Sequence, residues 1–252
     1  MSKNMSRFKN LNYDSFKELA QNSKLSKFEK IGFPDSYRLN LEPLIYRDIC
    51  FKLPSLLRLE GVVVDIGCGC SELPELLAKS ALELNQNLML VDSKEMLDQL
   101  QIEPNDKVVK YPAQFPNCPE LISEFRGKVN SVLVYSVIQY VFSEGNLFDF
   151  IDNALLLLAS GGRMLIGDIP NISMRKRFFA SDRGIVHHQE FTKSKAGPSV
   201  IFNTIELNQI DDSVMIAIVT RARLAGFHAF ILPQSDDLPM ANRREDILII
   251  RP

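Results

Sequence analysis

The segment from Gly61 to Glu72, GVVVDIGCGCSE, constrains the fold more than any other part of the chain. Its three valines and one isoleucine are β-branched and predict a strand buried on both faces of a sheet. Asp65 then lies at the carboxyl end of that strand, where ligands bind in open α/β sheets. Gly67 and Gly69 predict a tight turn whose backbone can approach a ligand closely, because glycine has no Cβ.

A helix is expected directly after this turn. Ser71 is a typical N-cap residue. Leucines follow at helical spacing, at Leu73, Leu76, Leu77 and Leu84. This order of elements is typical of a site for a nucleotide-like cofactor. A dinucleotide fingerprint requires a third glycine at position 72, where Glu72 stands, so an NAD-dependent oxidoreductase is disfavoured. A turn that binds no ligand stays open as an alternative.

The same run resembles motif I of the class I S-adenosylmethionine (SAM) dependent methyltransferases, an acid-x-Gly-x-Gly pattern formed here by Asp65, Gly67 and Gly69. Ser71 stands where the family often has a further glycine. The resemblance covers about residues 61–170 and 222–252. It implies a seven-strand Rossmann-like fold, SAM as the cofactor and methyl transfer as the activity.

The whole pattern predicts an α/β fold: a three-layer, doubly wound sheet, mostly parallel, with an antiparallel final strand. After the first strand, further strands are expected at 87–92, 107–111, 129–135, 163–168, 227–232 and 246–250. A helix at 148–160 is expected to end at Gly161 and Gly162. Another is expected to begin at Asp211 or Asp212 and to stop at Gly226.

Two additions to this core are expected. Residues 1–57 are predicted to form a helical cap or lid. One helix is expected around Tyr13 to Ala20, capped by Asp14 or Ser15, and a second from about Glu42 to Leu57. Residues 58–252 are predicted to form the SAM-binding Rossmann-like domain, with an insertion at about 172–209 after the fifth strand.

The cofactor contacts follow from the ends of the strands. Asp92 lies about 25 residues after the first glycine, near the ~20 expected of an acid that hydrogen-bonds a ribose. The alternative is a surface aspartate that caps the helix from Ser93. Family members often carry an adenine-side acid after the third strand, and Gln114 is the substitute here. The predicted cofactor-binding residues are Asp65, Gly67, Cys68, Gly69, Asp92, Gln114, Tyr135 and Ser136.

The acceptor is expected on the other side of the site. The segment after the fourth strand resembles family motif IV but lacks its Asn/Asp-Pro-Pro-aromatic form, so nucleic-acid bases and glutamine rank low as acceptors. Positive charge gathers in the insertion of a chain whose net charge is −2, which favours a small anionic acceptor such as an activated sugar. A solvated helix face is the alternative for these charges. The predicted substrate-binding residues are Tyr37, Arg38, Gln139, Arg175 and Arg177.

Candidate bases for an oxygen acceptor are His187, His188 and Asp168. Adjacent histidines on a strand point opposite ways, so at most one is expected to serve the site. A metal-assisted methyltransferase would need carboxylates after strands four and five, and the fourth strand supplies none, so no metal is predicted. Both O- and N-methylation stay open. A non-catalytic SAM-fold binding or regulatory protein is the main alternative, and an NAD-dependent oxidoreductase is the third.

Composition bounds the partners. The 252 residues are 46% hydrophobic and 24% charged, as in ordinary globular proteins. A net charge of −2 gives no general attraction to nucleic acid or an anionic membrane, and no apolar run reaches the ~18–20 residues that span a bilayer. Met1 to Asn10 lack the apolar core of a signal peptide. The four cysteines form no C-x-x-C pair, so neither a zinc site nor a disulfide framework is indicated, and a reducing cytoplasm is predicted. The partner predicted from the acceptor-side residues is a small molecule.

Overall fold

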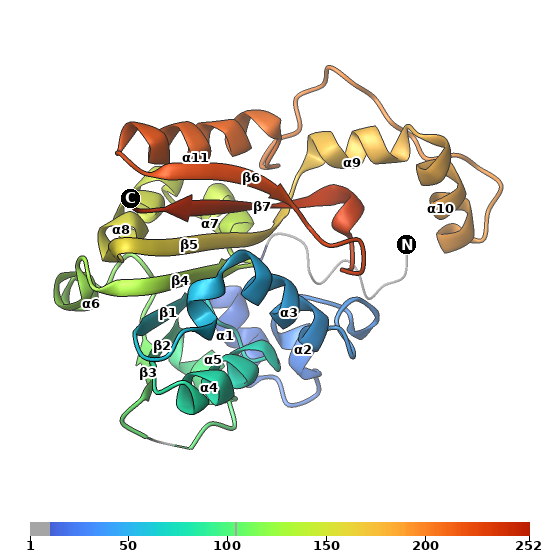
Figure 1. The fold of residues 1–252 in the computed structure, drawn as a ribbon. Coiled ribbons are helices and arrows are strands. Elements are labelled where there is room, and N and C mark those ends of the chain that lie inside the picture. Colours follow the sequence, from blue (N-terminus) through green and yellow to red (C-terminus); the bar gives the residue numbers. More distant parts are fainter. Residues whose placement is uncertain (1–10, 104) are drawn as a thin grey trace.

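A central sheet of seven strands organises the computed structural model, which describes residues 11–103 and 105–252 (Figure 1). The segment 1–10, on which the signal-peptide prediction rests, lies outside the described residues. The strands are β1 (Val62–Ile66), β2 (Asn87–Asp92), β3 (Val108–Pro112), β4 (Val129–Tyr135), β5 (Leu158–Pro170), β6 (His228–Pro233) and β7 (Arg244–Ile250). Their order is β3-β2-β1-β4-β5-β7-β6, and β7 runs antiparallel to both of its neighbours. The predicted doubly wound α/β fold is confirmed.

Helices cover both faces of the sheet. The N-terminal ones are α1 (Tyr13–Gln21), α2 (Lys27–Lys30), the 3-10 turn η2 (Asp35–Tyr37), α3 (Glu42–Lys52) and the 3-10 turn η3 (Pro54–Leu57). Those within the α/β core are α4 (Leu73–Glu83), α5 (Lys94–Leu97), α6 (Pro119–Phe125), α7 (Ile138–Glu144), α8 (Leu147–Leu157) and α11 (Asp212–Leu224). The insertion holds α9 (Ile172–Phe179) and α10 (Asp182–Thr192), and η4 (Ala241–Arg243) precedes β7.

The three layers follow from the alternation of side chains along each strand. Val64 and Val132 point into one core, which α6, α8 and α11 complete. Val63 and Leu133 point into the opposite core, which α3 and α4 complete. Because α3 shares this second core with the strands, it packs as part of the sheet's cover. The predicted division into a lid of 1–57 and a domain of 58–252 stays a prediction.

Several boundaries differ from those expected. Helix α8 ends at Leu157, because Leu158 already pairs with Val129 and β5 is longer than predicted. The second N-terminal helix ends at Lys52, since Pro54 cannot donate the next helical hydrogen bond. His187 and His188 lie on a helix, α10, so the argument from strand alternation was wrong.

Two helix caps also differ. The cap of α1 is Asn12, whose side chain accepts from the backbone N–H of Ser15, rather than Asp14 or Ser15. Ser71 does not cap α4. Instead the buried Glu42 carboxylate accepts both the Ser71 hydroxyl, at 3.0 Å, and the Leu73 backbone N–H, at 2.9 Å. A residue from α3 therefore serves the helix start that the local sequence assigned to Ser71.

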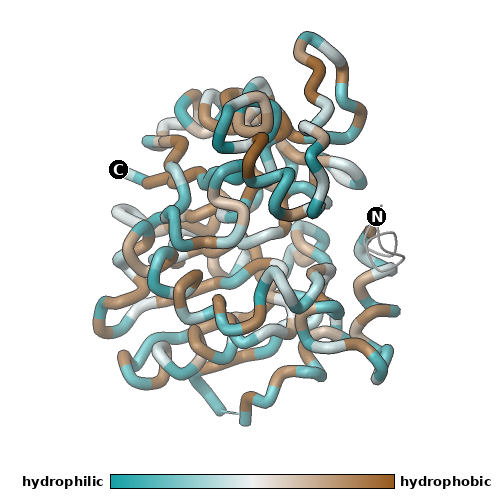
Figure 2. The backbone as a smooth tube through the Cα atoms, turned by 90° about the vertical axis from the view of Figure 1, so that its right-hand side faces the viewer, coloured by the Kyte–Doolittle hydropathy of each residue, from teal (hydrophilic) through white to brown (hydrophobic). Residues whose placement is uncertain are grey.

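The insertion departs furthest from the core. The segment between α10 and α11 rises above the rest of the chain in both views (Figures 1 and 2). Several of its apolar side chains are exposed, among them Ile201, Phe202, Ile205 and Leu207. Figure 1 shows α9 leaving the carboxyl end of β5, beside the turn that leads into β7. The insertion therefore stands at the end of the sheet where ligands bind in such folds.

Candidate functional site

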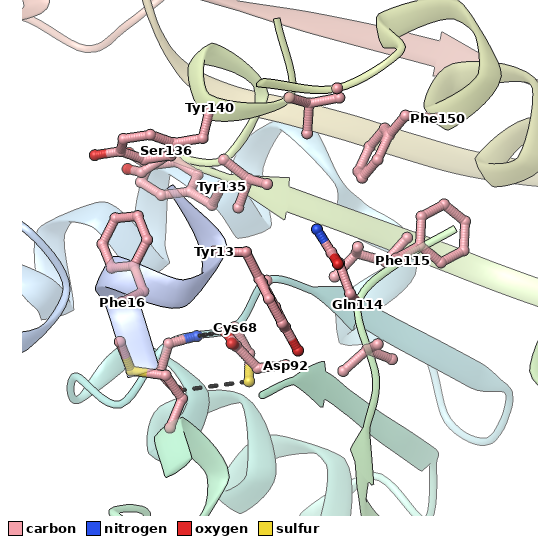
Figure 3. A pocket seen from close by; sticks show the side chains of 18 of the residues that line it. Tyr13, Phe16, Cys68, Asp92, Gln114, Phe115, Tyr135, Ser136, Tyr140 and Phe150 are labelled. Atoms are coloured by element: carbon pink, nitrogen blue, oxygen red, sulfur yellow. Dashed lines mark hydrogen bonds between the residues drawn. The ribbon is translucent and has the colours of Figure 1, made fainter. Parts of the chain in front are cut away.

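A cavity of about 430 Å³ opens at the carboxyl ends of the central strands (Figure 3). The chain runs outward from β1 to β3 and then returns to β4 on the other side of β1, so the cavity lies at the topological switch point of the sheet. Its walls come from α1, the segment between α2 and α3, the turn after β1, the ends of β2 and β4, the loop after β3, α7 and α8. Of the predicted site residues, those that line it are Arg38, Gly67, Cys68, Gly69, Asp92, Gln114, Tyr135 and Ser136.

The glycine turn after β1 forms one wall and has the conformation that the sequence predicts. Gly67 and Gly69 take φ of +73° and +66°, values that residues with side chains rarely adopt. A Cβ on Gly67 would come within 2.5 Å of Val137 Cγ2, and one on Gly69 within 2.8 Å of Ile31 Cγ2. The turn is thus packed so closely that its backbone, and no side chain, faces the cavity at these positions.

Asp92 ends β2 beside this turn. Its Oδ2 accepts the Gly69 N–H at 2.8 Å, and its Oδ1 accepts the Ser93 N–H at 2.6 Å. Burial raises the pKa of the carboxyl to about 6, against the lowering effect of these two hydrogen bonds. Ser93, and not Asp92, caps α5. The carboxylate therefore faces the cavity with acceptor capacity left over, since each oxygen has two lone pairs.

Asp65 lies behind the turn, outside the residues that line the cavity. It is 2% exposed, and its Oδ2 has no hydrogen-bond partner in the part of the chain that the structure describes. Burial, and secondarily the charge of Asp92, raise the pKa of Asp65 to about 8. Neither Asp65 nor Asp92 makes an ion pair with a described residue.

Aromatic side chains that sequence reasoning missed close the other walls. Tyr13 and Phe16 reach the cavity from α1, and Figure 3 shows the Tyr13 ring close to Asp92. Burial, and then the charge of Asp92, raise the pKa of the Tyr13 hydroxyl to about 12. Phe16 makes an edge-on contact with Tyr140, with 4.8 Å between ring centroids. The three-residue spacing of Tyr13 and Phe16 on a helix was the available signal, because it puts both on one face.

The wall opposite α1 contains Gln114, which follows β3 and lines the cavity as predicted. Beside it, Phe115 packs edge-on against Phe150 of α8, at a centroid distance of 5.1 Å. The amide of Gln114 is the polar group that this wall offers next to two aromatic rings (Figure 3). A planar, heteroaromatic ligand with polar edges fits such surroundings.

Arg38, Ser136, Asp168 and Arg244 form a buried cluster, here called the arginine cluster, next to the cavity. Arg38 is 3% exposed and donates from Nη2 to Ser136 Oγ at 2.6 Å and to Asp168 Oδ2 at 2.9 Å. The Ser136 hydroxyl also donates to Asp168. Arg244 Nη1 lies 2.7 Å from the same carboxylate oxygen. The guanidinium carbon of Arg38 is 4.3 Å from the ring centroid of Phe33.

Asp168 is therefore held from several sides. Its Oδ1 accepts from Gln234 at 3.4 Å, and its backbone N–H donates to Asp246, which pairs with Lys52 at 2.6 Å. Ser136 and Asp168 both take positive φ, +60° and +59°, at the ends of their strands. The cluster ties the segment before α3 to β4, β5 and β7.

The remaining predicted residues do not line this cavity. Gln139 donates to the Ser136 carbonyl at 2.7 Å. Tyr37 is half-buried and directly precedes Arg38 in the sequence. Arg177 makes a two-pronged pair with Asp212, at 2.5 and 3.3 Å. His187 packs on α10 with its ring centroid 5.5 Å from that of Phe178. The histidines and the basic residues of α9 are thus not brought together with the glycine turn.

Within residues 11–103 and 105–252, no three His, Cys, Asp or Glu side chains are grouped as a metal site requires. The predicted absence of a metal stays a prediction. None of the described helices is long and apolar enough to cross a membrane. The cytoplasmic location likewise stays a prediction.

Comparison with known proteins gives the class of fold. No protein-family model and no curated protein sequence matches the chain. Among solved structures, the plantazolicin methyltransferase BamL, in complex with a triazolic desmethylPZN analogue and S-adenosylhomocysteine (SAH), is similar with a TM-score of 0.60 and 10% identity, over 99% of this chain and 97% of that one.

Two further methyltransferases are similar. The N-methyltransferase NodS from Bradyrhizobium japonicum WM9, with SAH, has a TM-score of 0.55 and 14% identity over 95% and 98% of the two chains. The geranyl diphosphate C-methyltransferase from Streptomyces coelicolor A3(2), with Mg²⁺, geranyl diphosphate and SAH, has 0.53 and 13% over 93% and 88%. At these identities the likeness concerns the fold. The chain has the fold of the class I SAM-dependent methyltransferases, as the resemblance to motif I implied.

Proposed function

We propose that the protein is a SAM-dependent methyltransferase that acts on a small acceptor carrying negative charge. The observation that carries the proposal is the cavity at the switch point, where a glycine turn with positive φ and the carboxylate of Asp92 meet. The neighbours of the same fold were solved with SAH, the product of methyl transfer from SAM.

The residues around the cavity fit SAM. Asp92 would accept hydrogen bonds from the ribose hydroxyls, and the backbone at Gly67, Cys68 and Gly69 would face the remainder of the cofactor. Gln114, between β3 and the ring of Phe115, would meet the polar edge of the adenine. Tyr135 and Ser136 would lie toward the methionine end.

When bound, SAM supplies a methyl group on a cationic sulfur. The protein's own task is then to hold the acceptor close and aligned, which can be worth several kcal/mol of the barrier. His187, His188 and Asp168 stay candidate bases, but α10 lies outside the cavity and Asp168 is bound by two arginines. We therefore assign none of them a proton-transfer step.

An anionic acceptor, such as a phosphorylated or nucleotide-linked sugar, is supported by Arg175, an exposed basic residue of α9 beyond the carboxyl end of β5. Tyr37, Arg38, Gln139 and Arg175 are proposed to border the acceptor. Arg177 is left out of the proposal because Asp212 already binds its guanidinium group in two places. The chemistry of the accepting atom, oxygen or nitrogen, is not part of the proposal.

Calorimetric titration of the protein with SAM, SAH and NAD tests the cofactor. We expect SAM and SAH to bind and NAD not to bind. Asp92→Ala should weaken SAM binding by about 1–3 kcal/mol, because hydrogen bonds to a charged acceptor are lost. Asp98→Ala is the matched control, since Asp98 lies six residues further on, is exposed and pairs with Lys94. Tighter binding of NAD than of SAM would contradict the proposal.

Catalysis is tested separately, by incubating the protein with methyl-labelled SAM and a metabolite extract. Labelling of an anionic small molecule is the expected result, and labelling of a neutral compound would remove the anionic acceptor while leaving the methyltransferase standing. SAM binding without any transfer would favour the alternative of a non-catalytic, SAM-binding protein.

A further inference from the structure

Two arginines outside the cavity lie against one buried aromatic ring. The guanidinium carbon of Arg175, in α9, is 5.1 Å from the ring centroid of Phe179, and that of Arg243, in η4, is 5.7 Å from the same centroid. We call Arg175 and Arg243 the arginine pair. They are 68 positions apart in the sequence and meet because α9 follows β5 and η4 precedes its partner strand β7.

The backbone around the arginine pair is fixed. The N–H of Asn171 donates to the carbonyl of Arg243 at 3.1 Å, and the N–H of Arg175 donates to the carbonyl of Asn171 at 2.9 Å. The Asn171 side chain donates to Glu245 at 2.6 Å and to Asp212 at 2.8 Å. One buried asparagine therefore joins the start of α9 to η4, and fixes the two backbone segments that carry Arg175 and Arg243.

The arginine pair differs from its basic neighbours in making no ion pair within 4 Å among the described residues, although Arg175 lies close enough to Glu206 to lower the pKa of that carboxyl. Lys176 pairs with Glu206 at 2.7 Å, Arg177 pairs with Asp212, and Arg244 pairs with Asp168. Burial lowers the pKa of Arg243, Tyr37 acts against this, and the positive charges of Arg244 and Arg175 lower it further. The two like charges repel each other, and a bound anion would offset that repulsion.

A second cavity, of about 380 Å³, adjoins Arg175 and Phe179. Lys176 and His188 line it from α9 and α10, and the segment after α10 closes it with polar and apolar groups, including Ser199 and Ile201. Glu206 also lines it and pairs with Lys176, and Arg243 lies outside its lining. Arg175 is thus the arginine of the pair that borders this cavity, which leaves room for a further part of a ligand.

We infer that Arg175 and Arg243 form a binding site for a phosphate or diphosphate group. This inference rests on the proposed function in one respect: the group belongs to the methyl acceptor, and the site holds it beside the arginine cluster. Guanidinium groups bind phosphate oxygens in pairs through their planar N–H donors. The ring of Phe179 keeps both groups in place by cation–π contact, so less conformational freedom is lost on binding.

The direct test is calorimetric titration of the full chain with inorganic pyrophosphate and phosphate in the absence of SAM. Arg175→Gln and Arg243→Gln are measured singly and together. Arg221→Gln is the matched control, because Arg221 also lies over a phenylalanine ring, at 5.4 Å from Phe148, but pairs with Asp152. We expect pyrophosphate to bind the parent, the double variant to bind at least tenfold more weakly, and Arg221→Gln to bind within twofold of the parent.

Two results would overturn the site: equal pyrophosphate affinity of the parent and the double variant, or an equal loss in Arg221→Gln, which would mean unspecific attraction. Arg175 is exposed, so Arg175→Gln is expected to fold normally, and thermal unfolding of each variant checks this. Because the titration contains no SAM, failure of SAM to bind would remove the proposed function and leave this result readable. Once an acceptor is found, its KM should rise in the double variant while the SAM affinity stays unchanged.

Discussion

The two sides of the cavity are built in opposite ways. On the cofactor side, the groups are close in sequence: Gly69 and Asp92, which share a hydrogen bond, are 23 residues apart. On the acceptor side, Arg38 binds Ser136 and Asp168 across 98 and 130 residues. On the cofactor side, the Oδ2 of Asp65 has no hydrogen-bond partner among the described residues. The arginine cluster instead pairs Asp168 with two cations.

This difference suggests a division of work. Asp92, which makes no ion pair with a described residue, favours a ligand that brings positive charge and hydrogen-bond donors, and SAM has both. The arginine cluster is charge-compensated and buried, so it gains little from a ligand and mainly fixes the segment before α3 against the strand ends. We therefore expect substitutions on the cofactor side to change mainly ligand binding, and substitutions in the arginine cluster to change mainly the stability of the fold.

The largest effect is expected from Gly67→Val on the cofactor side. The new side chain meets Val137 Cγ2 already at its Cβ, 2.5 Å away, and valine is strained at φ +73°. We expect SAM binding to be lost in calorimetric titration, with the sheet still folded by circular dichroism. Gly197→Val is the control, since nothing lies within 4 Å of a Cβ there. A folded Gly67→Val variant that binds SAM normally would contradict the cofactor site.

The next largest effect concerns the acceptor side and the stability of the fold. Arg38→Ala leaves Glu42 buried without its cation and removes one of the two cations at Asp168. Loss of one partner of a buried pair costs about 3–5 kcal/mol, measured as the free energy of unfolding in urea. Arg47→Ala is the control, because Arg47 and Asp237 are exposed and such pairs contribute at most about 1 kcal/mol. A loss as small as that of the control would mean that the arginine cluster does not fix the segment before α3.

The same contrast explains what the sequence could predict. The strand, the turn and the acid of the cofactor side are encoded within about thirty residues, so composition and spacing reveal them. The strand β4 was predicted with its observed bounds for the same reason. Ser71 was misassigned because its partner, Glu42, comes from another helix.

The acceptor side could not be predicted in this way. No local pattern says that Arg38 reaches Asp168, because this contact joins the segment before α3 to β5. Nor does one say that Arg243 and Arg175 lie against the same ring, since this depends on how β5 pairs with β7. Arg177 looked equivalent to Arg175, but two positions along a helix turn the side chain to another face, where Asp212 binds it. Tyr13 and Phe16 were visible only as an amphipathic face, whose partner the sequence did not name.

A smaller effect, again on the cofactor side, is the dependence of stability on pH. The pKa of Asp65 is about 8 in the folded protein and near 3.9 in the unfolded chain, so between these values the folded state binds one more proton. Stability therefore falls as pH rises, by roughly 2 kcal/mol between pH 6 and pH 8, at ~1.4 kcal/mol per pH unit and proton. Urea unfolding at several pH values should show this slope.

Asp65→Asn tests the origin of that slope, because an amide of the same shape does not titrate. The variant should lose the decrease between pH 6 and pH 8. An unchanged slope would assign the effect to another group and would mean that Asp65 is ionised in the folded protein.

The smallest effect expected is on the affinity for SAM at acid pH. If ribose hydroxyls donate to ionised Asp92, binding should weaken as pH falls through the pKa of about 6, because protonation takes away acceptor capacity. Between pH 7 and pH 5 the ionised fraction falls about tenfold, and the Kd should rise by up to the same factor. The α-amino and α-carboxyl groups of SAM titrate outside this range.

Asp92→Asn separates this effect from general acid destabilisation. The amide still accepts one of the two backbone N–H groups that Asp92 binds, at Gly69 and Ser93, but it has no charge to lose. Its SAM affinity should be weaker than that of the parent at pH 7 and nearly constant from pH 7 to pH 5, so that the two curves converge at acid pH. Parallel curves would show that a different group senses the pH, and the cofactor side would then lack the titrating acid that sets it apart from the arginine cluster.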